Sequence, residues 1–124
     1  MANDWTGKTL GQVIRDTRVA GGRSLREFAR VVGITPSYQS DIENDRRIPS
    51  EDVLKKMAVS LSLNYEELMS LAGRFGDDAE RYLRRNPTAG ALFRKLSETN
   101  APENVLRKML QEAKELERKK EDGE

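Results

Sequence analysis

The segment Gly33-Ile34-Thr35-Pro36 limits the fold of this chain more than any other part of the sequence. Glycine is the usual residue just past a helix end, because it adopts the left-handed backbone conformation without strain. Threonine suits the N-cap of a following helix, and proline suits its first position, where a backbone N–H would be unpaired in any case. The sequence therefore predicts that one helix ends at Gly33 and that another begins a few residues later.

The helices on both sides of this turn are predicted to be short. Ser24 precedes Glu27 by three residues, which is the spacing of a capping box at a helix start. An apolar stripe of Leu25, Phe28, Ala29 and Val32 follows, and Ile42 can point inward from the next helix. Together these signals predict two helices and a tight turn over residues 24–44.

Three further helices complete the predicted N-terminal part. Leu10, Val13 and Ile14 recur at helical spacing between a cap at Thr9 and the pair Gly21-Gly22. Another helix is expected to open at Pro49-Ser50-Glu51-Asp52, and the next at Asn64-Tyr65-Glu66-Glu67. Strand signals are missing, so we predict an all-α protein.

The length of 124 residues, of which 36% are hydrophobic, allows one compact domain with an appendage or two small helical units. Charged helical segments begin after Gly73-Arg74-Phe75-Gly76, with expected starts at Asp77, Asn86-Pro87 and Asn100-Ala101-Pro102-Glu103. We therefore expect a domain over residues 1–75 and a helical tail over 76–124. Fraying is expected from about Lys119.

The composition excludes several function classes. Without Cys or His, the chain lacks the usual zinc ligands, the thiol nucleophile and the commonest general acid or base. Neighbouring carboxylates such as Glu66 and Glu67 would point to different sides of a helix. We expect no enzyme activity, no metal and no cofactor.

Residues 1–5 show no secretion segment, and no run approaches a membrane span of ~18 apolar residues, so a cytoplasmic protein without membrane contact is expected.

Two short helices joined by a tight turn match the helix-turn-helix arrangement, in which the second helix enters the major groove of double-stranded DNA. The polar face expected to read base edges comprises Ser37, Ser40, Asp41 and Asn44, with Tyr38 beside it. A carboxylate near phosphates is repelled, so Asp41 must either accept from cytosine or pair with a neighbouring arginine. Tyr38 either stacks on sugar-phosphate or covers the turn.

Residues 10–72 resemble the Cro/repressor, or XRE, family of helix-turn-helix regulators. The resemblance is carried by the Gly33 turn, the Ile42-Glu43 pair and the basic loop Arg46-Arg47-Ile48-Pro49, with two helices behind them. It implies a five-helix, lambda-repressor-like DNA-binding domain, followed here by a short helical extension. It also implies that Arg18 pairs with Glu43 while facing a phosphate, and that Pro36, Ser37 and Asp41 occupy base-reading positions.

Two positions depart from the family pattern. Leu25 stands where members often have a phosphate-binding glutamine, so that contact is either absent or replaced by Arg26. Gln39 stands where members usually have an aliphatic residue. Either Gln39 is buried with its amide satisfied, or the helix is rotated and Gln39 joins the base-reading face.

Phosphate contacts are expected from arginines that flank the recognition helix, because such contacts hold a protein on DNA without reading sequence. Besides Arg18, the arginines best placed for this role are Arg23, Arg26, Arg46 and Arg47. The 22 basic and 21 acidic residues nearly balance, so a basic face must arise from local placement. Trp5 is expected either as an arm to DNA or a partner, as an apolar plug, or as part of a disordered leader.

The tail is predicted to pack on something, since each segment has only one apolar stripe. Leu106, Met109, Ala113 and Leu116 follow heptad spacing for about two heptads and are candidate homodimer contacts. Alternatively, the tail folds back on the domain, or receives a protein partner or a small inducer. The sequence thus favours a dimeric repressor on a palindromic operator; the alternative is an antitoxin-like or regulator-partner module that uses the same fold.

Overall fold

The computed structural model describes Trp5 and residues 7–122, and these residues form eight helices and no strand. The chain divides into two compact units, with the division between Gly76 and Asp77. The prediction of an all-α protein is confirmed. None of the helices in the described part is both long enough and apolar enough to cross a membrane.

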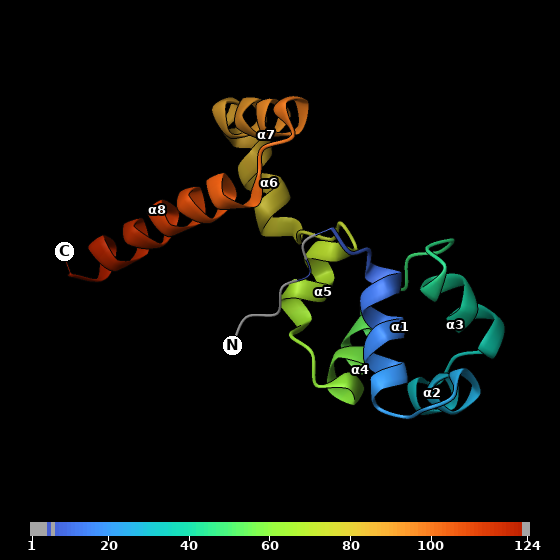
Figure 1. Ribbon diagram of the computed structural model, residues 1–124. Coiled ribbons are helices and arrows are strands. Elements are labelled where there is room, and N and C mark those ends of the chain that lie inside the picture. Colours follow the sequence, from blue (N-terminus) through green and yellow to red (C-terminus); the bar gives the residue numbers. More distant parts are fainter. Residues whose placement is uncertain (1–4, 6, 123–124) are drawn as a thin grey trace. The chain divides into compact units, whose positions relative to one another are not determined.

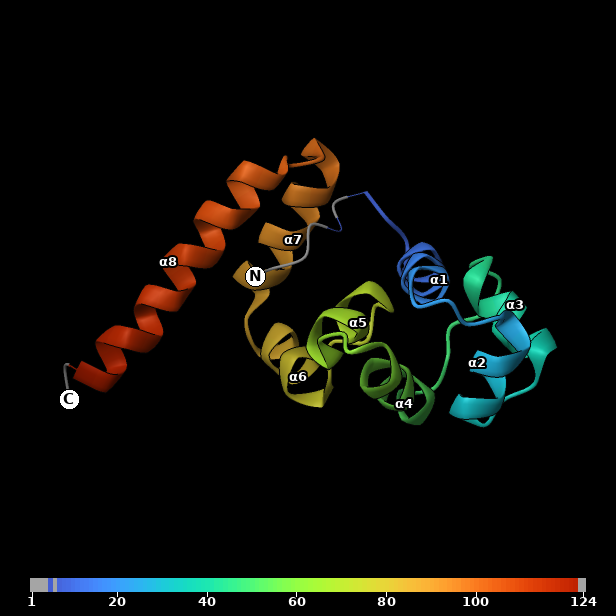
Figure 2. The ribbon, with the colours of Figure 1, turned by 60° about the horizontal axis from the view of Figure 1, so that its bottom comes forward.

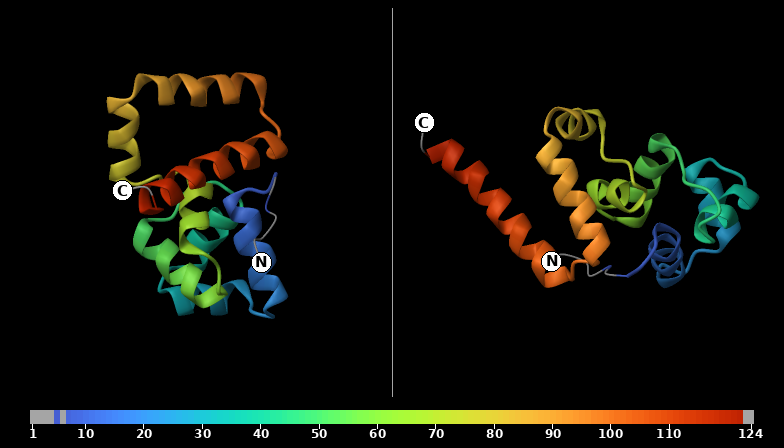
Figure 3. Two further views of the ribbon diagram at one scale, coloured as in Figure 1. Left: turned by 90° about the vertical axis from the view of Figure 1, so that its left-hand side faces the viewer. Right: turned by 90° about the horizontal axis from the view of Figure 1, so that it is seen from above.

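The first unit contains five helices, α1 (Leu10–Ala20), α2 (Leu25–Val32), α3 (Pro36–Glu43), α4 (Glu51–Leu61) and α5 (Tyr65–Leu71). Within it, α1 and α2 each pack against α3 and α4, and α5 packs against α4. Helices α3 and α5 lie at opposite ends of the unit (Figures 1 and 2), and the right-hand view of Figure 3 shows the same arrangement. The helix pair of the predicted helix-turn-helix therefore forms one end of the unit.

Local capping determines where these helices begin. The side chains of Thr9, Ser24, Thr35, Ser50 and Asn64 each accept the backbone N–H three residues ahead, and Gln12 and Glu27 complete capping boxes at the first two. Gly33 ends α2 in the left-handed conformation, with φ of 80°. The predicted caps at Thr9, Ser24, Thr35 and Asn64 are confirmed.

A single apolar core holds the five helices together. Its largest fully buried side chains include Phe28, Ile14, Ile42, Leu54, Met57 and Leu68, so each of the five helices contributes at least one. Trp5 is half-buried and packs against this cluster, as the apolar plug among its alternatives predicted. Met1 to Asp4, the rest of the predicted leader, lie outside the described residues.

The second unit consists of α6 (Asp77–Arg85), α7 (Pro87–Thr99) and α8 (Glu103–Asp122). All three expected starts are confirmed. Helix α8 continues to Asp122, so the fraying expected from about Lys119 is wrong for Lys119 to Asp122, whereas Gly123 and Glu124 lie outside the described residues. No residue of these three helices is buried.

Candidate nucleic-acid interface

Helix α3 has one face in the core and one face toward solvent. Gln39, Ile42 and Glu43 are buried, whereas Ser37 and Asn44 are exposed and Ser40 and Asp41 are half-buried. The exposed positions are spaced by three or four residues, which places them on one side of the helix. The structure therefore brings together four of the polar residues predicted to read bases.

A buried ion pair fixes the C-terminal end of α3 to α1. Arg18 Nε and Nη2 donate to the two carboxylate oxygens of Glu43 at 2.7 and 2.9 Å, and Arg18 Nη1 donates to the carbonyl of Arg23 at 2.8 Å. The side chains are only 10% and 4% exposed. The hydrogen bond to Glu43 raises the pKa of Arg18, so its guanidinium stays charged.

These contacts give Arg18 a structural role. Its three nitrogens each donate to a protein acceptor, and the residue is 9% exposed, whereas its expected contact with a phosphate remains a prediction. The pairing with Glu43, which the family resemblance implied, is present in the structure.

Of the two alternatives for Gln39, the base-reading one is wrong. Its side chain is fully buried, and its Nε2 donates to Glu43 Oε2 at 2.8 Å. Its Oε1 is buried without a hydrogen-bond partner among the described residues, so the amide is only half satisfied. The orientation of α3, set by Ile42 in the core and Glu43 on Arg18, turns Gln39 inward.

Two arginines of the loop after α3 fold over its polar face. Arg46 Nε lies 3.0 Å from Asp41 Oδ1, and the Arg47 guanidinium lies 4.3 Å from the centre of the Tyr38 ring. Of the two alternatives for Asp41, pairing with a neighbouring arginine is therefore the one present in the structure. Tyr38 is half-buried and packs against the core, and its ring carries the Arg47 cation.

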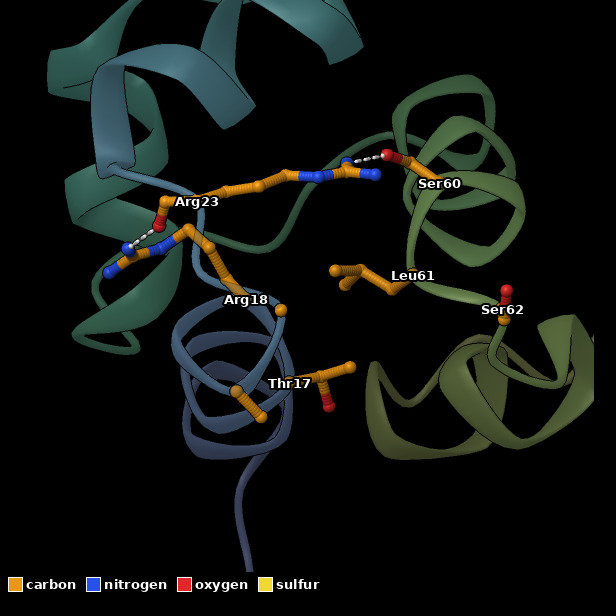
Figure 4. A pocket seen from close by; sticks show the side chains of 8 residues that line it. Thr17, Arg18, Arg23, Ser60, Leu61 and Ser62 are labelled. Atoms are coloured by element: carbon orange, nitrogen blue, oxygen red, sulfur yellow. Dashed lines mark hydrogen bonds between the residues drawn. The ribbon is translucent and has the colours of Figure 1, made fainter.

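Arg23 does not flank α3. Its Nη1 donates to the hydroxyl of Ser60 at the end of α4, and its guanidinium lies 5.9 Å from the Phe28 ring centre. Figure 4 shows Arg23 extending from the α1–α2 loop toward α4, while Arg18 turns the other way. The side chain of Arg23 therefore bridges α2 and α4, and its expected phosphate contact remains a prediction.

One candidate phosphate contact was missed by sequence reasoning. Arg15 is exposed on α1 and lines a shallow pocket with Leu25, at the start of α2, and Asn44, at the end of α3. Arg26, which is also exposed, follows Leu25 on α2. Helical spacing predicts that Arg15 lies on the exposed face of α1. No sequence signal showed that Arg15 on this exposed face lies next to the end of α3.

A second missed feature holds the loop after α3. Asp45 Oδ2 accepts from the Thr9 hydroxyl at 2.6 Å, and Oδ1 accepts from the backbone N–H of Gly11 at 3.0 Å. Thus the segment that joins the polar face of α3 to Arg46 and Arg47 is attached to the N-terminus of α1.

The fold and this surface together define a helix-turn-helix DNA-binding protein, and comparison with known proteins supports this class. The family model described as Helix-turn-helix matches residues 14–68. The ImmF control region 10 kDa protein of Bacillus phage phi105 is 37% identical over 62 residues, which cover 50% of this chain and 69% of that protein.

The transcriptional regulator ClgR of Mycobacterium tuberculosis is 31% identical over 84 residues, covering 68% of this chain and 75% of ClgR. A crystal structure of SinR, described as the master regulator for biofilm formation in complex with DNA, is 34% identical, with a TM-score of 0.46. It covers 49% of this chain and 98% of that one. This chain belongs to the XRE-type helix-turn-helix family, and it is a transcriptional regulator with a helix-turn-helix DNA-binding domain.

Proposed function

We propose that this regulator represses transcription by binding a palindromic operator as a homodimer, with α3 of each copy in the major groove. The observation that carries the proposal is the polar face of α3, Ser37, Ser40, Asp41 and Asn44, on a helix whose opposite face is fixed in the core. A helix held in this way can present side chains to base edges in a constant orientation.

The base-reading role falls on short polar side chains. Ser37 and Ser40 offer hydroxyls. Asn44 offers its amide oxygen, while its Nδ2 donates to the Ser40 carbonyl at 2.8 Å. Asp41 acts together with Arg46, because the ion pair offsets the repulsion between its carboxylate and phosphates. Tyr38 supports Arg47 beside this face.

The phosphate contacts fall on Arg15, Arg26, Arg46 and Arg47, which are exposed in the first unit. Arg46 and Arg47 follow α3 directly, and Arg15 lines the pocket between α2 and the end of α3. These arginines supply the salt-dependent, sequence-independent part of DNA binding.

The homodimer is proposed to form through the second unit. Leu106 and Leu116 of α8 are 39% and 68% exposed, and Met109 and Ala113 share their stripe. A second copy would cover this apolar surface, and a dimer would place two recognition helices on half-sites roughly 34–36 Å apart or a multiple of that.

Selection of bound sequences from random double-stranded DNA tests the proposal. We expect a two-fold symmetric site and a complex with two chains. Replacing both Arg46 and Arg47 by Ala should weaken binding to all sequences and make the slope of log K against log salt shallower by about 2, at ~0.9 for each lost phosphate contact.

The double variant Lys55→Ala with Lys56→Ala, which removes the same charge from the exposed side of α4, is the control and should retain most of the slope. An unchanged slope in the Arg46 and Arg47 variant would show that these arginines do not contact phosphate. A site without symmetry, bound by one chain, would contradict the palindromic operator.

A protein-partner module is the second candidate, favoured by the exposed apolar side chains of the tail, including Tyr82 at 61% and Phe93 at 56%. Under this alternative, the second unit binds a different protein rather than a second copy. Sedimentation of the purified chain separates the two: a monomer at all concentrations favours the partner module, and a dimer favours the repressor.

A further inference from the structure

Asp45 occupies a position where glycine is the usual residue. It is the first residue after the C-cap of α3, and its φ of 59° lies in the left-handed region. L-residues with a side chain avoid this conformation, although Asp and Asn adopt it more readily than most. A glycine would relieve the backbone, so the presence of a carboxylate here calls for a function of the side chain.

The carboxylate closes the first turn of α1 from a distant part of the chain. Gly11 is the second residue of α1, and its N–H is one of the amides that an isolated helix leaves unpaired. Asp45 accepts this N–H and also the hydroxyl of Thr9, the N-cap residue. A negative charge at a helix N-terminus is favourable, so the contact is stabilised by the helix dipole as well.

The backbones of α1 and α3 meet at the same place. A Cβ atom on Gly11 would lie 2.5 Å from the carbonyl oxygen of Glu43 and 2.6 Å from that of Ile42. The last turn of α3 therefore rests directly on the first turn of α1. At the other end of α1, Arg18 holds the side chain of Glu43.

These contacts attach the end of α3 to α1 on both sides of Asn44. Glu43 is bound by the C-terminal half of α1 and Asp45 by its N-terminus, so rotation of α3 about its own axis would break one attachment or the other. We infer that Asp45 is a positioning residue for DNA reading, which fixes the rotation of α3 and the start of the Arg46-Arg47 loop.

The inference rests on the proposed placement of α3 in the major groove, and it predicts a specific kind of defect. Hydrogen bonds to base edges require narrow geometry, whereas long arginine side chains can follow a phosphate over a larger range. Loss of the Asp45 contacts should therefore reduce binding to the operator more than binding to unrelated DNA.

The test uses the full chain, the operator selected from random DNA, and unrelated DNA of equal length. Asp45→Gly keeps the left-handed backbone and removes both hydrogen bonds. We expect its operator affinity to fall about tenfold, as two lost hydrogen bonds allow, and its affinity for unrelated DNA to change less than ~2-fold. Asp45→Asn retains one of the two acceptor oxygens and should show an intermediate loss of operator affinity.

Ser62→Gly is the matched control, because Ser62 also has a left-handed backbone, with φ of 56°, but ends α4. It should leave both affinities unchanged. All variants are compared at a temperature where circular dichroism shows them folded. If Asp45→Gly is unfolded, the test rests on Asp45→Asn, whose operator affinity should fall by an intermediate amount while its affinity for unrelated DNA stays the same.

An equal loss of affinity for both DNAs, or an unchanged operator affinity, would overturn the inference and leave Asp45 with a purely structural role. These results would leave the proposed function intact. A wild-type chain without any sequence preference would contradict the proposed function, and this inference with it.

Discussion

Glu43 and Asp41 lie two residues apart on α3, and each pairs with an arginine, but in very different surroundings. The side chains of Arg18 and Glu43 are 10% and 4% exposed, whereas those of Arg46 and Asp41 are 61% and 28% exposed. Removing one partner of a buried pair leaves an uncompensated charge, whereas water screens an exposed pair. The first pair therefore holds the helix, whereas the second pair is open to solvent.

Replacing Glu43 by Ala should lower the free energy of unfolding by about 3–5 kcal/mol, because Arg18 and Gln39 lose their buried acceptor. Asp41→Ala, the control on the same helix, should cost less than ~1 kcal/mol. Urea denaturation followed by circular dichroism measures both values. Similar losses for the two variants would show that burial does not distinguish the pairs.

At the scale of elements, the crossing of α1 and α3 determines how the recognition helix is presented. Gly11 allows the two backbones to approach, because any side chain there would meet the carbonyls of Ile42 and Glu43 and the Asp45 carboxylate. Glycine inside a helix normally costs ~1 kcal/mol relative to alanine. At this position, the close approach outweighs that cost.

Gly11→Ala is therefore expected to destabilise the domain by ~1–3 kcal/mol, although helix propensity alone predicts a gain. Gly21→Ala serves as the control, because Gly21 ends the same helix with φ of −81° and a Cβ there would lie 3.5 Å from its nearest neighbours. Thermal unfolding measures both changes. A stabilising Gly11→Ala would contradict the close approach.

At the scale of the whole molecule, the two units differ in how much apolar surface they bury. The first unit has a core to which all five of its helices contribute, whereas α6, α7 and α8 contain no buried residue. Apolar surface left exposed on three helices is a common sign of association. The proposed division of labour places DNA binding in the first unit and self-association in the second.

A charge on the apolar stripe of α8 should disrupt the proposed dimer. Leu106→Asp in the full chain is expected to shift sedimentation from dimer to monomer, and truncation after Gly76 should do the same. Both changes should weaken cooperative operator binding. Lys108→Asp, which places the charge on a different side of α8, should remain dimeric. A truncated protein that stays dimeric and binds equally well would refute the role of the tail.

The sequence by itself determined the helices and their order. Caps such as Thr9, Ser24 and Thr35 act within three residues, so their effect is written in local sequence, and the Gly33 turn specifies the helix-turn-helix. The spacing of polar residues on α3 also predicted its exposed face, and the family resemblance implied the pair of Arg18 and Glu43.

Only the tertiary structure decided which polar side chains face solvent and which hold the domain together. Gln39 turned out to be buried, Arg23 reaches Ser60 on α4, and Asp45 caps α1. The last two contacts join residues more than thirty positions apart, and the burial of Gln39 depends on the rotation of α3 against α1. Such contacts arise only when packed helices bring distant segments together, so no local pattern predicts them.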